Sequence, residues 1–309
     1  MTPDEAPYAT KARGIAATLP PGLALGIVAV VLFSFSFPAT KLAVGGLDPL
    51  FVSFGRAVVA GGLSIAVLAA TRAPWPTAAQ WRGLAIVAAG VVIGFPVLTA
   101  IALDAQTSAH VAVVTAVMPA ATAVMAVLRA GERPSPAFWL AALAGMVLVL
   151  AFAVIQGAGD LERDDVLLIV SVALVAMGYA EGGVLGRDLG GTRTICWALV
   201  LSLPLTIVVS AVVTARSTFV DIEAEAWLGF AYVSLFSMFI AFFAWYAGLA
   251  RGGVAKIGQV QLVMPLLTLG WAAFLLGERV TVGTVATAVA VLACVVATQR
   301  AHVEPAPGD

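Results

Sequence analysis

Three ionisable residues stand inside long apolar runs of the chain, where a charge is costly. Lys41, Arg56 and Glu181 each have mostly hydrophobic neighbours in sequence. Inserting a charged side chain into an apolar span costs about 2.5–3.5 kcal/mol, so each of the three is a functional candidate. Arg56 could bind the carboxylate of a ligand or pair with backbone carbonyls. Lys41 could face a cavity or extend to a polar boundary. Glu181 could carry a coupled proton or serve as a structural carboxylate.

Two proline-containing segments place polar side chains on one helical face. Thr115, Met118 and Thr122 recur at helical spacing beside Pro119. The second segment repeats the pattern with Gln261, Met264 and Thr268, beside Pro265. Proline removes a backbone hydrogen bond, which predicts a kink and a free carbonyl acceptor at each site. We expect the faces to form two walls of a binding cavity. The alternative is that the threonines bond to their own helices and the methionines fill gaps.

Other polar and aromatic residues join the candidate cavity. They are Ser34, Phe37, Pro38, Phe95, Tyr179 and Trp245. Aromatic rings around a mainly apolar pocket suit an aromatic or hydrophobic amino acid as the bound molecule. For most of the aromatic residues in the chain, packing against neighbouring helices or lipid is the alternative.

The two proline segments belong to an internal duplication. Residues 114–133 and 260–279 are identical at nine of twenty positions, without a gap, at an offset of 146. Each copy carries Met-Pro and, further on, Gly-Glu-Arg. The residues of this motif are Pro119, Gly131, Glu132, Pro265, Gly277 and Glu278. We expect the two glutamates to end helices and anchor loops, with a gate as the alternative. A repeat of this kind governs every later inference about the fold.

The composition is that of a membrane protein. Of the 309 residues, 61% are hydrophobic and 11% charged, against roughly 25% charged in soluble domains. Apolar runs near 20 residues recur, the length that crosses a bilayer core of about 30 Å. A net charge of −1 without a basic cluster gives no sign of nucleic-acid binding. No metalloprotease, nucleophile-elbow or phosphate-loop motif occurs, so we expect no enzyme, no metal and no cofactor.

Ten transmembrane helices can be placed along the chain. They span residues 22–44, 49–70, 81–103, 108–129, 137–156, 165–186, 194–214, 226–248, 255–276 and 281–299. Eleven Lys and Arg residues then fall on the side of the N-terminus and four on the other. The positive-inside rule therefore predicts cytoplasmic termini, with residues 1–21 as an N-terminal segment and 300–309 as a tail.

The duplication and the span count together predict an architecture. Residues 22–156 and 165–299 would each hold five helices. Because five is odd, the second copy must enter the membrane from the opposite side. The fold class is thus an all-α membrane protein of ten helices, arranged as two inverted five-helix repeats around a central cavity. Such proteins bind their substrate between the repeats and work by alternating access. A passive channel and a structural scaffold are the alternatives.

These features resemble one known family. Ten spans in two copies, each with the Pro and Gly-Glu-Arg motif in its fourth helix, resemble the EamA-type branch of the drug/metabolite transporter superfamily over residues 22–299. Within it the chain is similar to YddG-like aromatic amino-acid exporters. The resemblance implies a secondary transporter of the bacterial inner membrane that works without ATP hydrolysis. Its partners would be a small-molecule substrate, an amino acid or related metabolite, and the lipid bilayer; its oligomeric state is left open.

Overall fold

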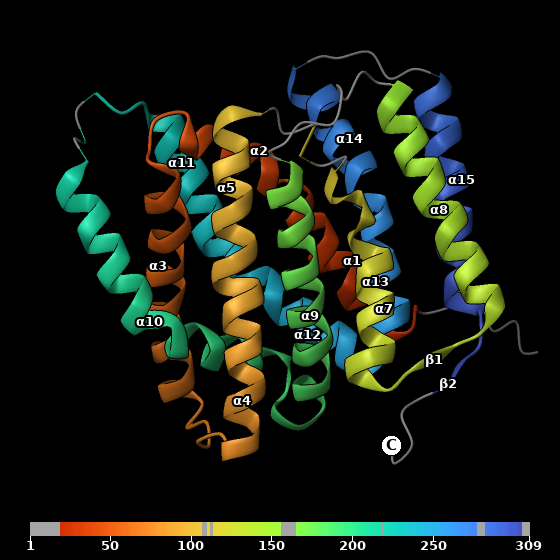
Figure 1. Cartoon of the computed structure of the whole chain (residues 1–309), viewed down its shortest axis with the longest axis horizontal. Coiled ribbons are helices and arrows are strands. Elements are labelled where there is room, and N and C mark those ends of the chain that lie inside the picture. The colour runs from red at the N-terminus through yellow and green to blue at the C-terminus, as the bar shows by residue number, and fades with distance from the viewer. Residues whose placement is uncertain are drawn as a thin grey trace, which may run out of the picture.

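The chain folds as an almost entirely helical bundle (Figure 1). A computed structural model describes residues 19–106, 110–111, 114–155, 165–217, 219, 221–276 and 282–304. The elements of the first half are α1 (Pro21–Ser34), α2 (Ser36–Val44), α3 (Pro49–Ala70), α4 (Ala78–Val87), η1 (Ala88–Gly94), α5 (Phe95–Ala105), η2 (Thr115–Val117), α7 (Met118–Ala130), β1 (Arg133–Pro134) and α8 (Pro136–Ile155).

The second half has a similar succession of elements. They are α9 (Asp165–Leu189), α10 (Gly191–Arg216), α11 (Ala224–Tyr232), η3 (Val233–Ile240), α12 (Ala241–Gly252), α13 (Val254–Gly258), η4 (Gln259–Val263), α14 (Met264–Leu276), α15 (Val282–Arg300) and β2 (Val303–Glu304). The two short strands pair antiparallel, with Arg133 opposite Glu304. This pairing ties the loop after α7 to the C-terminal end of α15.

Six helical segments within the described residues are long and apolar enough to cross a membrane. They are Pro21–Val44, Pro49–Ala70, Ala78–Ala105, Asp165–Leu189, Gly191–Arg216 and Ala224–Gly252. Four shorter apolar helices accompany them: Thr115–Ala130, Pro136–Phe152, Val254–Thr268 and Val285–Arg300. The expectation of a helical, multi-pass membrane protein is confirmed, whereas the count of ten spans stays a prediction.

Local sequence signals explain where several helices begin and end. Asp48 caps α3, accepting the Leu50 N–H at 2.8 Å, and Pro49 follows as the first helical residue. Thr77 and Gln80 form a reciprocal capping box at the start of α4. The α7 helix ends at Gly131, whose φ of 68° lies in the left-handed region that favours glycine.

Departures from α-helical geometry occur at matching places in the two halves. The π-helical segments η1 and η3 stand about 146 residues apart, as do the 3₁₀ segments η2 and η4. Each 3₁₀ segment leads directly into a Met-Pro pair. The Met118 N–H bonds to the Thr115 carbonyl, and the Met264 N–H to the Gln261 carbonyl. The carbonyls that we expected the prolines to free are therefore satisfied, because the tighter turn supplies another donor.

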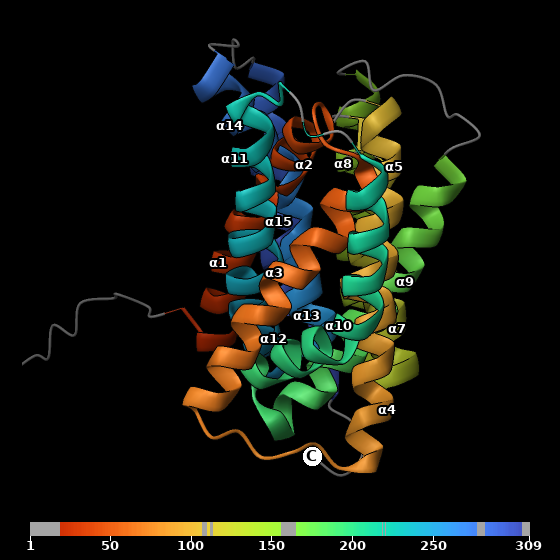
Figure 2. The same ribbon diagram turned by 90° about the vertical axis from the view of Figure 1, so that its left-hand side faces the viewer.

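The helices pack closely where small residues face one another. An added Cβ on Gly248 of α12 would lie 3.1 Å from the Gly22 carbonyl oxygen and the Gly26 nitrogen of α1. Small residues at such a crossing let two backbones approach within membrane-spanning bundles. At one edge of the molecule α3 packs along α10 (Figure 2), and at the other α8 packs along α15 (Figure 1).

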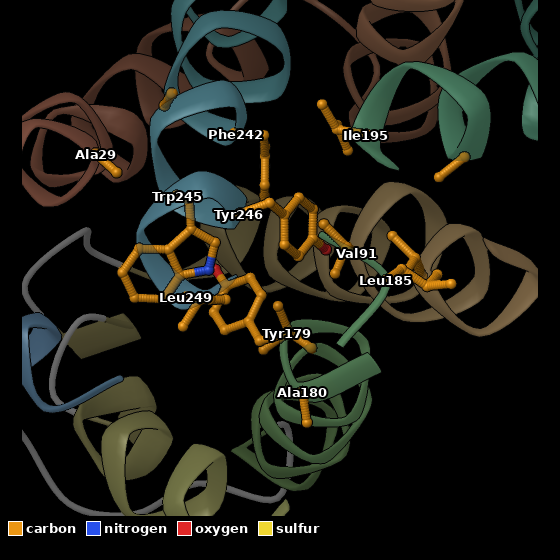
Figure 3. Packing of buried hydrophobic residues seen from close by; sticks show 14 of the residues in the cluster. Ala29, Val91, Tyr179, Ala180, Leu185, Ile195, Phe242, Trp245, Tyr246 and Leu249 are labelled. Carbon is orange, nitrogen blue, oxygen red and sulfur yellow. The ribbon is translucent and has the colours of Figure 1, made fainter. Parts of the chain in front are cut away.

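The largest buried cluster centres on α12. Trp245 and Tyr246 of this helix are fully buried, and both lie beside Tyr179 of α9 (Figure 3). The rings of Tyr179 and Trp245 are 5.2 Å apart between centroids, edge to face. The Tyr246 hydroxyl donates to the Gly178 carbonyl at 3.3 Å. These contacts give the cavity described below a rigid wall behind its lining residues.

Candidate functional site

A central cavity lies between the two halves of the chain. It covers about 560 Å³ of space, part of which is open to solvent. Its walls come from both halves and are mainly apolar and aromatic. They consist of Phe33, Ser36, Phe37, Thr40, Arg56, Val91, Phe95, Pro96, Thr99 and Met118 of the first half, and Val175, Tyr179, Ser237, Met238, Phe242, Gln261 and Met264 of the second. A pocket of this composition can hold a small organic molecule.

The duplication is visible in the lining itself. Four pairs of lining residues stand 146 positions apart in the sequence. They are Phe33 with Tyr179, Val91 with Ser237, Pro96 with Phe242, and Met118 with Met264. The two halves thus contribute corresponding positions to one shared cavity.

Arg56 breaks this internal symmetry. The residue 146 positions later is Ser202, whose hydroxyl donates to the Leu199 carbonyl of its own helix at 2.7 Å and does not line the cavity. Arg56 lines the cavity and is only 6% exposed. Its Nε has no hydrogen-bond partner in the described part of the chain, and none of the ion pairs formed there includes it. Burying a guanidinium without a partner is costly, and an anionic group could bind it through charge-assisted hydrogen bonds.

A second, smaller pocket adjoins the first at the two proline segments. It covers about 310 Å³ of space, part of which is open to solvent. It shares four lining residues with the central cavity: Phe37, Met118, Gln261 and Met264. Thr115, Thr268, Pro119 and Pro265 also line it. Residues from both predicted faces therefore line two adjoining pockets.

The hydroxyl groups around these pockets are largely satisfied by the protein. Ser36 donates to Ser237 at 2.8 Å, which links α2 to η3 across the two halves. Thr115 bonds the Val111 carbonyl at 2.7 Å, and Thr268 donates to the Ser34 carbonyl at 2.9 Å. By contrast, the Nε2 of Gln261 is buried without a partner among the described residues. Gln261 and Arg56 thus each have a buried donor atom left for a ligand.

Three predicted residues lie behind the lining. Ser34 accepts from the Trp271 indole nitrogen at 2.8 Å. Trp245 packs edge to face on Phe33 with centroids 6.0 Å apart. Thr122 faces α13, because a Cβ on Gly258 would lie 2.8 Å from its methyl group. They position the cavity wall and do not line it.

Lys41 caps a helix. Its Nζ donates to the Leu103 carbonyl at 2.7 Å and to the Asp104 carbonyl at 3.3 Å. Both carbonyls belong to the last turn of α5, where a cation is favoured by the helix dipole and by the unpaired acceptors. Neither Lys41 nor the nearby Pro38 lines the two pockets.

Glu181 also lies away from the cavity lining. Its carboxylate accepts two bonds from Arg129, from Nη2 at 2.6 Å and from Nε at 3.1 Å, which joins α9 to α7. Arg129 is 43% exposed. Glu181 therefore takes part in a partly exposed ion pair that joins two helices. This contact fits the structural role that we gave above as the alternative to carrying a proton.

Glu132 of the repeated motif connects the halves. It is 2% exposed, and its two carboxylate oxygens accept the backbone N–H groups of Val254 and Ala255 at 2.7 and 2.8 Å. Arg187 of α9 approaches the same carboxylate at 3.5 Å. Gly131 lets the chain turn toward this contact. The corresponding Gly277 and Glu278 lie outside the described residues.

Several lining residues were missed by the sequence reading: Phe33, Ser36, Thr40, Val91, Pro96, Thr99, Val175, Ser237, Met238 and Phe242. One signal could have found some of them. Moving a predicted lining residue by the repeat offset leads from Tyr179 to Phe33. The same shift leads from Trp245 to Thr99. Ser36, Thr40 and Ser237 carry no such signal, because serine and threonine are common at helix contacts throughout the chain.

The fold and the shared cavity define a multi-pass helical membrane protein with a small-molecule pocket between two related halves. Comparison with known proteins gives its family. The EamA-like transporter family matches the chain twice, over residues 20–155 and 163–298. The chain belongs to this family and is a transporter, which confirms the resemblance to the drug/metabolite transporter superfamily at that level.

Two individual proteins are similar to this chain. The uncharacterized transporter YdeK of Bacillus subtilis (strain 168) is 48% identical over 275 residues, covering 89% of this chain and 96% of the relative. A protein known from a crystal structure superposes with a TM-score of 0.73 at 17% identity, over 90% of this chain and 98% of that one. At this identity the second likeness shows the fold alone.

Proposed function

We propose that this protein is a secondary transporter that exports small metabolites with an apolar or aromatic body across the bacterial inner membrane. Neutral and aromatic amino acids belong to this class. In this proposal ten spans form two inverted five-helix repeats with cytoplasmic termini, and the cavity opens alternately to the two sides. The observation that carries the proposal is the shared cavity, to which both halves contribute matched residues around one unpaired cation.

The contacts between α7 and α13 support the inverted arrangement. Glu132, beyond the end of α7, bonds the first residues of α13. Further along, the side-chain nitrogen of Gln259 donates to the Pro119 carbonyl near the start of α7, at 2.9 Å. The two segments therefore run side by side in opposite directions. They belong to the two predicted spans that correspond in the repeat, 108–129 and 255–276, and corresponding helices of inverted repeats must run oppositely.

The Glu132 contact suggests how one end of the cavity is held closed. It joins the first half, through the loop after α7, to the start of α13 and to Arg187 in the second half. In an alternating-access cycle, the halves separate at this end when the cavity opens there. The contact therefore breaks and re-forms once per cycle.

The proposal is tested by counterflow in proteoliposomes. Vesicles containing the purified protein are preloaded with single unlabelled amino acids, and uptake of labelled phenylalanine, tryptophan or alanine is followed. We expect saturable uptake that is stimulated by the preload and lost in Arg56→Gln. Uptake that does not saturate and ignores the preload would instead identify a passive channel. A pH gradient imposed in parallel vesicles tests for proton coupling.

A further inference from the structure

The charges around the central cavity do not balance. Arg56 contributes a guanidinium, and Tyr179 is the other titratable residue among the described lining residues. Tyrosine is neutral at physiological pH. No Asp or Glu lines either pocket in the described part of the chain. The described lining of the cavity therefore carries one positive charge.

The carboxylates of the surrounding helices are directed elsewhere. Glu181 is paired with Arg129, Glu132 caps α13, and Asp165 is bonded to His110 at 2.8 Å. Asp48 caps the start of the same helix that carries Arg56. Each of these four has a partner of its own, and Asp104 of α5 and Asp188 of α9 are exposed and lie outside the lining. None of the six is therefore placed to neutralise Arg56 or to receive a ligand ammonium group.

A buried charge is stable only when it is paired. A ligand with one carboxylate would neutralise Arg56, and the guanidinium could bind both carboxylate oxygens. A zwitterion would also bring an ammonium group into a cavity that already holds a cation. Neutral acceptors and ring faces could solvate that ammonium, but they would leave the net charge in place.

The other lining residues of the cavity indicate which kind of ligand body would fit. The rings of Phe33 and Phe242 lie edge to face at 4.9 Å between centroids, and those of Phe37 and Phe95 lie 6.4 Å apart. These rings offer an apolar surface to an aromatic or branched group. Gln261, with its unpaired amide nitrogen, adds one neutral hydrogen-bond donor.

We propose that the cavity selects monoanionic organic acids: molecules with one carboxylate, an apolar or aromatic body and no ammonium group. This inference rests on the proposed function and narrows its substrate class from amino acids to their counterparts without the amine. Arg56 would bind the carboxylate, and the aromatic wall would bind the body.

Three ligands that share a phenylethyl framework and differ in charge provide the test. They are 3-phenylpropanoate, phenylalanine and 2-phenylethylamine, which are an anion, a zwitterion and a cation at neutral pH. Binding to the protein in lipid nanodiscs is measured by isothermal titration calorimetry. We expect 3-phenylpropanoate to bind about tenfold or more tightly than phenylalanine, and the amine to bind weakest, because like charges repel strongly in a desolvated site.

Variants test whether Arg56 causes this order of ligand affinities. Arg56→Gln should weaken 3-phenylpropanoate binding roughly 30-fold or more and remove the preference for the anion. Arg56→Lys keeps the charge and should keep the order. Arg129→Gln, the same change at a cation outside the cavity, is the control and should bind all three ligands as the parent protein does. The order of ligand affinities in the parent protein tests the inference even if a variant fails to fold.

The outcomes separate this inference from the proposed function. If phenylalanine binds as tightly as 3-phenylpropanoate or more tightly, the charge inference is wrong and the carrier proposal stands. If Arg56→Gln is folded and still prefers the anion, Arg56 is not the anion site. If none of the three ligands binds the parent protein, both the inference and the aromatic substrate class of the proposed function are overturned.

Discussion

The carboxylate of Glu132 accepts the backbone N–H of Val254 at 2.7 Å, across 122 positions of sequence. The same side chain accepts the Ala255 N–H at 2.8 Å. These N–H groups open α13, where no intrahelical acceptor exists. One side chain of the first half thus completes a helix of the second, beside Gly253, whose φ of 83° makes the turn between α12 and α13.

Replacing Glu132 by alanine should destabilise the protein. Two buried N–H groups would lose a charged acceptor, which costs about 2–3 kcal/mol. Glu132→Gln should cost less, because its amide oxygen can still accept one bond. Thermal unfolding in detergent measures the loss. Glu225→Ala removes an exposed carboxylate on α11 and is the control. Equal midpoints for Glu132→Ala and the parent would show that the contact adds nothing.

A methyl group at Gly182 should not fit. An added Cβ would overlap the ring of Tyr246, which is fully buried and held through its hydroxyl by the Gly178 carbonyl. We expect Gly182→Ala to cost about 1–3 kcal/mol through overpacking. Gly62→Ala is the matched control, since nothing lies within 4 Å of its added Cβ, and it should stabilise α3 by about 0.5–1 kcal/mol. A destabilised Gly62→Ala or a neutral Gly182→Ala contradicts this packing argument.

Lys41 and Arg56 should respond differently to loss of charge. Lys41→Met removes the cation that binds the last carbonyls of α5 and should cost about 1–2 kcal/mol of stability. It should leave ligand binding and its charge preference unchanged. Calorimetry with the ligand series and thermal unfolding report the two effects separately. A changed ligand order in Lys41→Met would place this residue in the binding machinery after all.

Glu181 should contribute little to stability or to transport. Its partner Arg129 is 43% exposed, and an exposed ion pair contributes about 0–1 kcal/mol. Glu181→Gln should therefore unfold within a few degrees of the parent and exchange substrate at the parental rate at every pH. Counterflow rates across a pH series provide the measurement. Loss of the pH dependence in this variant would support proton coupling through Glu181, contrary to our expectation.

The sequence by itself determined the class of the protein and its internal organisation. Apolar runs of membrane-spanning length arise from composition, and the Pro119 and Pro265 motifs reveal the duplication through residue order alone. Neither depends on knowing which helices touch. The family assignment confirms the transporter class, and the two adjoining pockets are lined by Thr115, Met118, Gln261 and Met264 from the two predicted faces. The inverted topology and the ten spans remain predictions.

Only the tertiary structure decided which polar side chains face the cavity. In sequence, Lys41 and Arg56 are both cations inside apolar runs, and both are candidates for a role in the cavity. Lys41 finds its carbonyl partners 62 and 63 positions away, at the end of α5, whereas Arg56 finds none among the described residues. The difference depends on how the helices are rotated and which helix end lies within reach. That information resides in long-range packing, because a helix presents side chains on all sides and its neighbours decide which side is buried.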